Sequence, residues 1–155
     1  MHNSRLESHE IFRHLRPEQM SVLSAAAEEI TFKGGDTVFL QGEMAEDFFV
    51  VLEGQVALRM LRSDGMSVLI DWATESAIFG SCVCFQIDAY ELTAQCTEDS
   101  KILRIRASAL KKLMDEDLVM GYAIQTTISR VYFKRYIDTM KKLQAIVQSI
   151  PLEAA

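Results

Sequence analysis

The most constraining feature of this chain is a run of short β-favouring segments between residues 30 and 106, divided by turn signals roughly every ten residues. The turns Gly34-Gly35-Asp36 and Ser63-Asp64-Gly65 separate segments rich in Val, Ile, Leu and Phe, and Gly54 divides another pair. A parallel sheet would need a helix between successive strands, and this spacing leaves no room for one. We therefore expect about eight strands in an antiparallel roll or sandwich.

Helical patterns stand on both sides of this run. Pro17 suits the first turn of a helix, and the apolar spacing after it predicts a helix over residues 17–29. The next stretch, ITFKGGDTVFLQG, predicts a β-hairpin. After Arg106, ASALKKLMDED predicts a short helix, and a long helix follows from about residue 118 to 149, before Pro151.

The far half of the long helix carries an apolar seam. Its residues recur at alternating steps of four and three, the spacing of a coiled coil: Tyr136, Met140, Leu143, Val147 and Ile150. This seam either packs on its own roll or pairs with the same helix of a second copy. Because it lies beyond easy reach of one roll, we expect a homodimer.

Together these elements define the fold class as α+β: an antiparallel β-roll of jelly-roll type, or double-stranded β-helix, with an N-terminal helix and two C-terminal helices. The 155 residues suit one core. We divide the chain into an N-terminal segment (1–16), the roll domain (17–115), the long dimerisation helix (116–150) and a tail (151–155).

Charge and composition exclude several classes of partner. The net charge of −6 opposes direct contact with nucleic acid or an anionic membrane surface. Lys134, Arg135, Lys141 and Lys142 are expected on a solvated helix face. No segment has the length of apolar sequence that a membrane span needs, and the N-terminus lacks the apolar core of a signal peptide, so we expect a cytoplasmic protein.

The strand and turn motifs resemble those of the cyclic-nucleotide-binding domain superfamily, the group that includes the bacterial catabolite activator. The resemblance covers residues 11–150, and its most specific part is GEMAEDFFVVLEGQV at 42–56. The stretch FKGGDTV at 32–38 matches the family's opening of the roll, and Ile78-Phe79-Gly80 stands where its phosphate-binding cassette begins. The resemblance implies a regulatory, non-catalytic β-roll.

The cassette departs from the family pattern at its charged positions. The resemblance implies a Glu for the ribose and an Arg for the phosphate, and this chain has Ser81 and Tyr90 there, or Glu91 or Leu92 if the register slips. None of these is a cation, so we expect ordinary cAMP or cGMP binding to be impaired. The candidate pocket residues are Phe79, Gly80, Ser81, Cys82, Val83, Tyr90, Glu91, Leu92 and Thr93.

Other chemistry finds little support in the sequence. Cys82, Cys84 and Cys96 form no disulfide framework and lack a fourth ligand at metal-binding spacing, so we interpret them as packing residues. No nucleophile stands with a base at recognisable spacing, so we expect no enzyme activity. We expect no cofactor, and a cyclic nucleotide or another small anion remains the open ligand hypothesis.

The sequence thus predicts a regulatory module with a degenerate cassette that relays ligand or partner state through a dimerising helix. Two alternatives stay open: a genuine cyclic-nucleotide receptor with an unusual phosphate clamp, and a ligand-free scaffold that docks on a separate effector protein. In the family's transcription factors a winged helix-turn-helix follows the long helix. None is present here, so we expect no independent transcription-factor activity.

Overall fold

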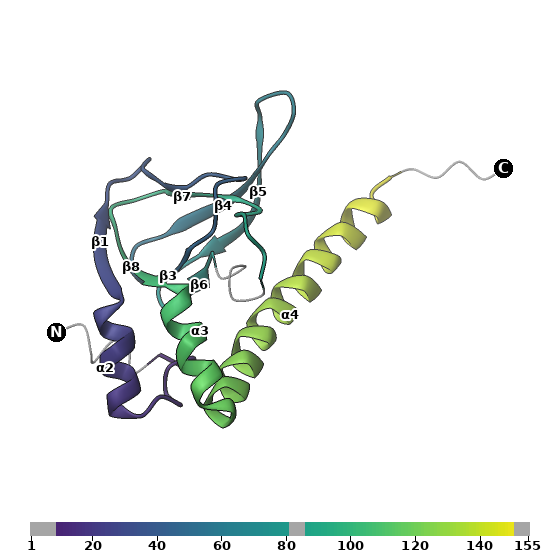
Figure 1. Cartoon of the computed structure of the whole chain (residues 1–155). Coiled ribbons are helices and arrows are strands. Elements are labelled where there is room, and N and C mark those ends of the chain that lie inside the picture. The colour runs from purple at the N-terminus through teal and green to yellow at the C-terminus, as the bar shows by residue number, and fades with distance from the viewer. Residues whose placement is uncertain (1–8, 81–85, 151–155) are drawn as a thin grey trace.

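The computed structural model describes residues 9–80 and 86–150. It confirms the α+β class, with two antiparallel sheets forming a roll and helices at its N-terminal and C-terminal sides (Figure 1). The helices are α2 (Pro17–Ala25), α3 (Ala107–Glu116) and α4 (Leu118–Gln148). The strands are β1 (Ala27–Phe32), β2 (Thr37–Phe39), β3 (Asp47–Glu53), β4 (Val56–Leu61), β5 (Ser67–Ala73), β6 (Ile78–Phe79), β7 (Thr93–Cys96) and β8 (Ser100–Arg106).

The strands divide into two sheets of four, ordered β1-β8-β3-β6 and β2-β7-β4-β5. The chain passes from one sheet to the other several times, so each sheet contains strands that are far apart in the sequence. Gly54 makes one of these passages, between β3 and β4, with a φ of +93°. A Cβ there would collide with the Ser100 side chain and lie 2.8 Å from the Asp99 carbonyl oxygen, which explains the glycine.

Two predictions about the N-terminal elements were wrong. The first helix ends at Ala25, and Glu28 and Glu29, expected to be helical, lie in β1. Six residues of β1 pair with β8, and this ladder outweighs a helical apolar spacing. The expected hairpin also fails, because β1 pairs with β8 in one sheet while β2 pairs with β7 in the other.

The apolar run of β3 is explained by burial on both faces. Phe48 and Val50 belong to a core cluster shared with the helices, whereas Phe49 and Val51 belong to the cluster inside the roll. Strand β3 is therefore continuously apolar, as expected for a strand covered on both sides.

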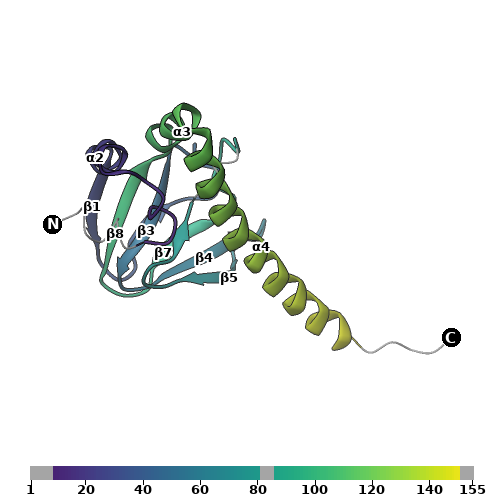
Figure 2. The same ribbon diagram turned by 90° about the horizontal axis from the view of Figure 1, so that it is seen from below.

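Helix α4 begins in the protein core and ends outside it. Its buried residues all lie in its first eleven positions: Met120, Gly121, Ile124, Thr127 and Ile128. Gly121 lets α4 approach α3 closely, since a Cβ would lie 2.6 Å from the Met114 carbonyl oxygen. From there α4 runs past the roll, and its C-terminal end projects away from it in both views (Figures 1 and 2). No helix in the described part of the chain is long and apolar enough to cross a bilayer.

Candidate ligand-binding site

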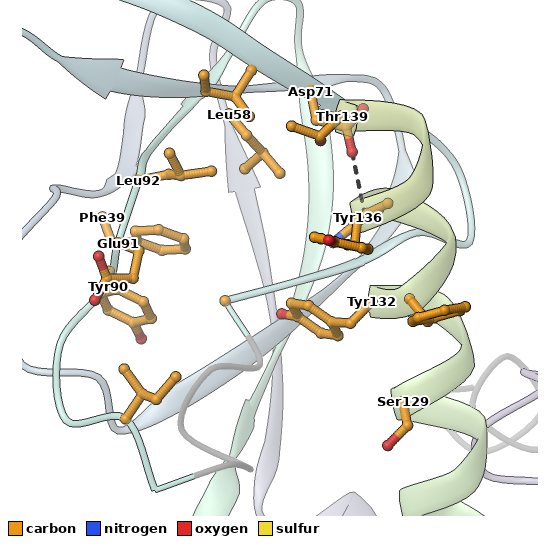
Figure 3. Close-up of a pocket in the computed structure, with 15 residues that line it drawn as sticks. Phe39, Leu58, Asp71, Tyr90, Glu91, Leu92, Ser129, Tyr132, Tyr136 and Thr139 are labelled. Atoms are coloured by element: carbon orange, nitrogen blue, oxygen red, sulfur yellow. Dashed lines mark ion pairs between the residues drawn. The ribbon is translucent and has the colours of Figure 1, made fainter. Parts of the chain in front are cut away.

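A cavity of about 660 Å³ lies between the roll and α4. Three parts of the chain that are distant in sequence form its walls: the strands β2, β4 and β5, the segment that leads into β7, and one face of α4 (Figure 3). Its volume falls within the range of sites that enclose a drug-sized molecule. The described lining residues are Phe39, Leu58, Ile70, Asp71, Gly80, Ile87, Tyr90, Glu91, Leu92, Ser129, Tyr132, Phe133, Arg135, Tyr136 and Thr139.

Tyr90 forms an aromatic wall of this cavity on the roll side. Its ring stacks on Phe39 with 3.8 Å between centroids, and its hydroxyl donates to the Asp47 carbonyl oxygen at 2.8 Å. Two backbone hydrogen bonds, to Gly42 and Glu43, hold the same residue against the turn before β3. With only 6% of its surface exposed, Tyr90 is packed into the roll.

Helix α4 supplies the opposite wall. Ser129, Tyr132, Phe133 and Tyr136 follow the i, i+3, i+4, i+7 spacing of one helical face, so the 3.6-residue period directs them toward the roll. Figure 3 shows Tyr132, Tyr136 and Thr139 on α4 across from Tyr90, Leu92 and Leu58. The two walls of the cavity therefore belong to different structural units, the roll and α4.

An ion pair between Arg135 and Asp71, which we call the latch, joins the two walls of the cavity. The Arg135 guanidinium of α4 lies with Nε 3.3 Å from an Asp71 carboxylate oxygen on β5 and donates to the Ile78 carbonyl oxygen at 2.7 Å. It also lies 5.8 Å from the centre of the Tyr132 ring. Lys142 adds a hydrogen bond to the Ile70 carbonyl oxygen at 3.2 Å. The tie between helix and roll is thus polar and lies at the cavity itself.

The prediction of a solvated face for Arg135 was wrong. Its side chain is 23% exposed, because the turn of α4 that carries it faces β5 and the strand end at Ile78. Sequence reasoning missed Arg135 as a lining residue together with its aromatic neighbours on α4. The helical spacing of Tyr132, Phe133 and Tyr136 was the signal that could have indicated a second apolar face upstream of the seam.

The predicted pocket residues separate into three groups. Gly80, Tyr90, Glu91 and Leu92 line the cavity, whereas Ser81, Cys82 and Val83 lie outside the described residues. Phe79 belongs to the core, with its ring 5.2 Å from Phe49, and the Thr93 hydroxyl accepts a hydrogen bond from the Gln41 N–H. The cassette residues that the structure describes thus make one edge of the cavity, and residues of β2, β4, β5 and α4 line the other sides.

Four of the five residues predicted for the dimer interface lie on the far part of α4, and Ile150 lies two residues beyond its end. Tyr136 lines the cavity while remaining more than half exposed, and the other four are exposed: Met140, Leu143, Val147 and Ile150. None of the five packs into a core cluster of the described chain.

A carboxylate at the base of α4 adds to the core packing that holds this end of the helix. Asp117 caps the helix by accepting a hydrogen bond from the Met120 N–H at 3.1 Å, and Gln19 and Arg16 of the α2 region also contact it. The Met120 hydrogen bond holds the pKa of Asp117 below its ordinary value, with smaller contributions from Gln19 and Arg16. This contact ties the start of α4 to the N-terminal helix.

The part of the chain that the structure describes contains no candidate metal site. No three His, Cys, Asp or Glu side chains gather there at ligating distance. Cys96 is buried inside the roll, as the packing interpretation predicts, and burial raises the pKa of its thiol. Cys82 and Cys84 lie outside the described residues.

Comparison with known proteins gives consistent matches. The family model described as "Cyclic nucleotide-binding domain" matches residues 29–117. The chain is 22% identical over 139 residues, 89% of its length, to a cAMP-dependent protein kinase regulatory subunit of Dictyostelium discoideum. It is also 22% identical over 142 residues, 88% of its length, to a CRP-like cAMP-activated global transcriptional regulator of Mycobacterium tuberculosis. The chain spans 42% and 59% of these two relatives.

Solved structures agree on the fold. The sensor domain of the transcriptional regulator DNR from Pseudomonas aeruginosa superposes with a TM-score of 0.76 and 23% identity, covering 99% of this chain and 96% of that one. A putative cyclic nucleotide-binding protein from Geobacter metallireducens gives 0.74 and 22%, covering 88% and 98%. These likenesses establish the architecture of the chain.

Proposed function

Since the chain belongs to the cyclic nucleotide-binding domain family, we propose that it is a non-catalytic sensor domain that binds a small molecule between its roll and α4. The roll domain, residues 17–115, provides one wall of the site. The helix at 116–150 provides the opposite wall and transmits the ligand-bound state. The observation that carries this proposal is that Tyr132, Phe133 and Tyr136 of α4 line the same cavity as Tyr90 and Leu92 of the roll.

A shared wall converts binding into movement of the helix. A ligand that contacts both walls stabilises one position of α4 over others, by as much as its affinities for those positions differ. The near part of α4 is held by core packing and by Asp117, so displacement is easiest beyond it, where the Arg135–Asp71 latch and Lys142 are the polar ties to the roll. The exposed seam from Tyr136 to Ile150 would pass this change to a second copy of the chain.

A second candidate function is cyclic-nucleotide reception through an unusual clamp. One observation favours it: the guanidinium of Arg135 stands at the cavity wall, so a phosphate that displaced Asp71 would find a cation. The curated relatives have cAMP in their names, which gives this candidate weight.

The test combines ligand binding with hydrogen exchange on α4. We would screen melting temperature against cyclic mononucleotides, cyclic dinucleotides and uncharged aromatic compounds, since a ligand at a hundredfold excess over its Kd adds about 2.7 kcal/mol of stability. Any ligand found should then change the deuterium uptake of residues 129–148. Binding that leaves this uptake unaltered would refute the relay.

Two tryptophan variants locate the binding event. Thr139→Trp adds a large ring at a lining position and should abolish the thermal shift, while Gln144→Trp adds the same ring on the exposed far part of α4 and should preserve it. If no compound binds and one protein dominates a pulldown, the chain is a ligand-free scaffold and the sensor proposal fails.

A further inference from the structure

The cavity combines an apolar lining with an internally neutralised cation. Of the described lining residues, nine are aromatic or aliphatic: Phe39, Leu58, Ile70, Ile87, Tyr90, Leu92, Tyr132, Phe133 and Tyr136. Aromatic rings stand on both walls, Tyr90 with Phe39 on the roll and Tyr132 with Tyr136 on α4 (Figure 3). Such walls suit a ligand that presents apolar or aromatic faces to both sides.

The charges in the lining oppose an anionic ligand. Arg135 is the one Lys or Arg among the described lining residues, and its carboxylate partner Asp71 lies in the same lining. Glu91 adds a further acid at the rim, so the formal charge of the described lining is −1 at neutral pH. The segment 81–85 contains no Lys or Arg in its sequence, so it adds no cation.

Freeing Arg135 for a phosphate or carboxylate would be costly. The guanidinium would have to leave Asp71, and that carboxylate would then stand unpaired beside the incoming anion. Its hydrogen bond to the Ile78 carbonyl oxygen adds to the cost, because a partly buried acceptor would lose its donor. An uncharged ligand leaves the latch intact and replaces only water against the apolar walls.

We infer that this cavity takes an uncharged ligand with an aromatic or otherwise apolar body, and that Asp71 sets this preference by occupying Arg135. The inference rests on the proposed function, whose site it shares, and it makes Asp71 a specificity-determining residue. Removing the Asp71 charge would convert the same cavity into one that accepts anions, because Arg135 would then lack its carboxylate partner.

Two fluorescent probes with the same aromatic body test this inference. N-phenyl-1-naphthylamine is uncharged, and 8-anilinonaphthalene-1-sulfonate is its sulfonated counterpart. The wild-type chain should bind the uncharged probe about tenfold more tightly than the sulfonate, a difference of roughly 1.4 kcal/mol. Thr139→Trp should remove the saturable binding of both probes, whereas Gln144→Trp should preserve it.

The charge variant makes the test specific. Asp71→Asn should raise sulfonate affinity by about tenfold and leave affinity for the uncharged probe within about threefold, and Arg135→Gln added to it should cancel that gain. Asp138→Asn is the control: it also removes one carboxylate, from a residue of α4 outside the lining, and should change neither affinity. Circular dichroism spectra and urea midpoints confirm that each variant is folded.

Several results would overturn the inference. They are wild-type binding of the sulfonate or cAMP at least as tight as that of the uncharged probe, no saturable binding of the uncharged probe, and equal behaviour of Asp71→Asn and Asp138→Asn. If cAMP binds and changes deuterium uptake in α4, the sensor function stands and the inference about ligand class fails. If the uncharged probe binds with the expected preference but leaves deuterium uptake in α4 unaltered, the inference about ligand class stands and the sensor function fails.

Discussion

The two halves of α4 differ in their surroundings: the near half packs in the core, and the far half is exposed. In the near half, Ile124 is fully buried, and with Met120 and Ile128 it belongs to the core cluster that α2, α3 and β8 also enter. In the far half, Ile146 is 61% exposed, and no residue from 136 to 150 is buried. The cavity lies between the buried half and the exposed half of α4, at Tyr132, Arg135 and Tyr136.

In the proposed relay, this contrast allows one helix to be both a structural element and an output. A helix buried along its whole length could not shift without unfolding the core, and one exposed along its whole length would not sense the roll. In the proposed relay, a small displacement of α4 at the cavity would move its far end, where the exposed apolar seam lies, by a larger distance.

Two matched alanine substitutions give the strongest test of the difference between the two halves of α4. Ile124→Ala should lower the free energy of unfolding by about 2–5 kcal/mol, because it leaves a cavity in the core. Ile146→Ala should change it by less than about 0.5 kcal/mol in dilute solution, since this side chain packs on no core cluster. Urea denaturation measures both, and equal losses would mean that the far half is packed against the roll.

Gly121 tests the near half from the backbone. Gly121→Ala should destabilise the protein by about 1–3 kcal/mol, because the added methyl would press on the Met114 carbonyl and force α3 and α4 apart. Helix propensity alone predicts a gain of about 1 kcal/mol, so the sign of the urea result separates the two effects. Ala145→Gly in the exposed half is the control and should cost only the propensity difference.

A charge in the seam tests the far half. Leu143→Glu should weaken self-association by about tenfold or more, since an apolar pairing position would have to bury a carboxylate. Gln144→Glu adds the same charge one residue along, off the seam, and should leave association nearly unchanged. Sedimentation equilibrium gives both constants, and a wild-type chain that stays monomeric at high concentration would refute the dimer proposal.

The smallest effect concerns the base of α4 and depends on pH. The pKa of Asp117 is lowered below its ordinary value of 3.8, chiefly by the Met120 hydrogen bond, so its ionised form stabilises the folded state at neutral pH. This contribution is lost as pH falls below the unfolded-state pKa and through the folded-state pKa. Asp117→Asn keeps a capping side chain and removes the charge, so its stability should be lower than wild type at about pH 6, and the difference should shrink as the pH falls through the folded-state pKa.

Asp138→Asn is the matched control, because it removes one carboxylate from the exposed far half of α4. A stability difference between wild type and Asp117→Asn that persists unchanged into acid would show that the charge is not responsible. Thermal melts across this pH range provide the measurement.

The sequence predicted the elements whose signals are local. Turn residues such as Gly54 and Gly65 divided the strands correctly, and the switch to helical spacing after Arg106 located α3 and α4. It failed where pairing partners are remote: residues 28 and 29 have a helical apolar context, yet they pair with Arg104 and Leu103 of β8. Local propensity carries no information about a strand that arrives more than seventy residues later.

The candidate site followed the same division. The resemblance placed Gly80, Tyr90, Glu91 and Leu92 in one region of the chain, and they do line the cavity. The resemblance also implied an arginine at Tyr90, Glu91 or Leu92, and none of these is a cation. The tertiary structure brings Arg135 to the cavity from α4, where its guanidinium is paired with Asp71.

Local patterns in the sequence were enough to predict a β-roll with a long terminal helix, because turns, alternation and helical periodicity act over neighbouring residues. Contacts between distant elements, which no such pattern contains, close the cavity between α4 and β5 and pair its cation with Asp71. That outcome depends on the angle at which α4 leaves α3, set by the close approach at Gly121 and the cap at Asp117, and packing of this kind joins residues that no local pattern relates.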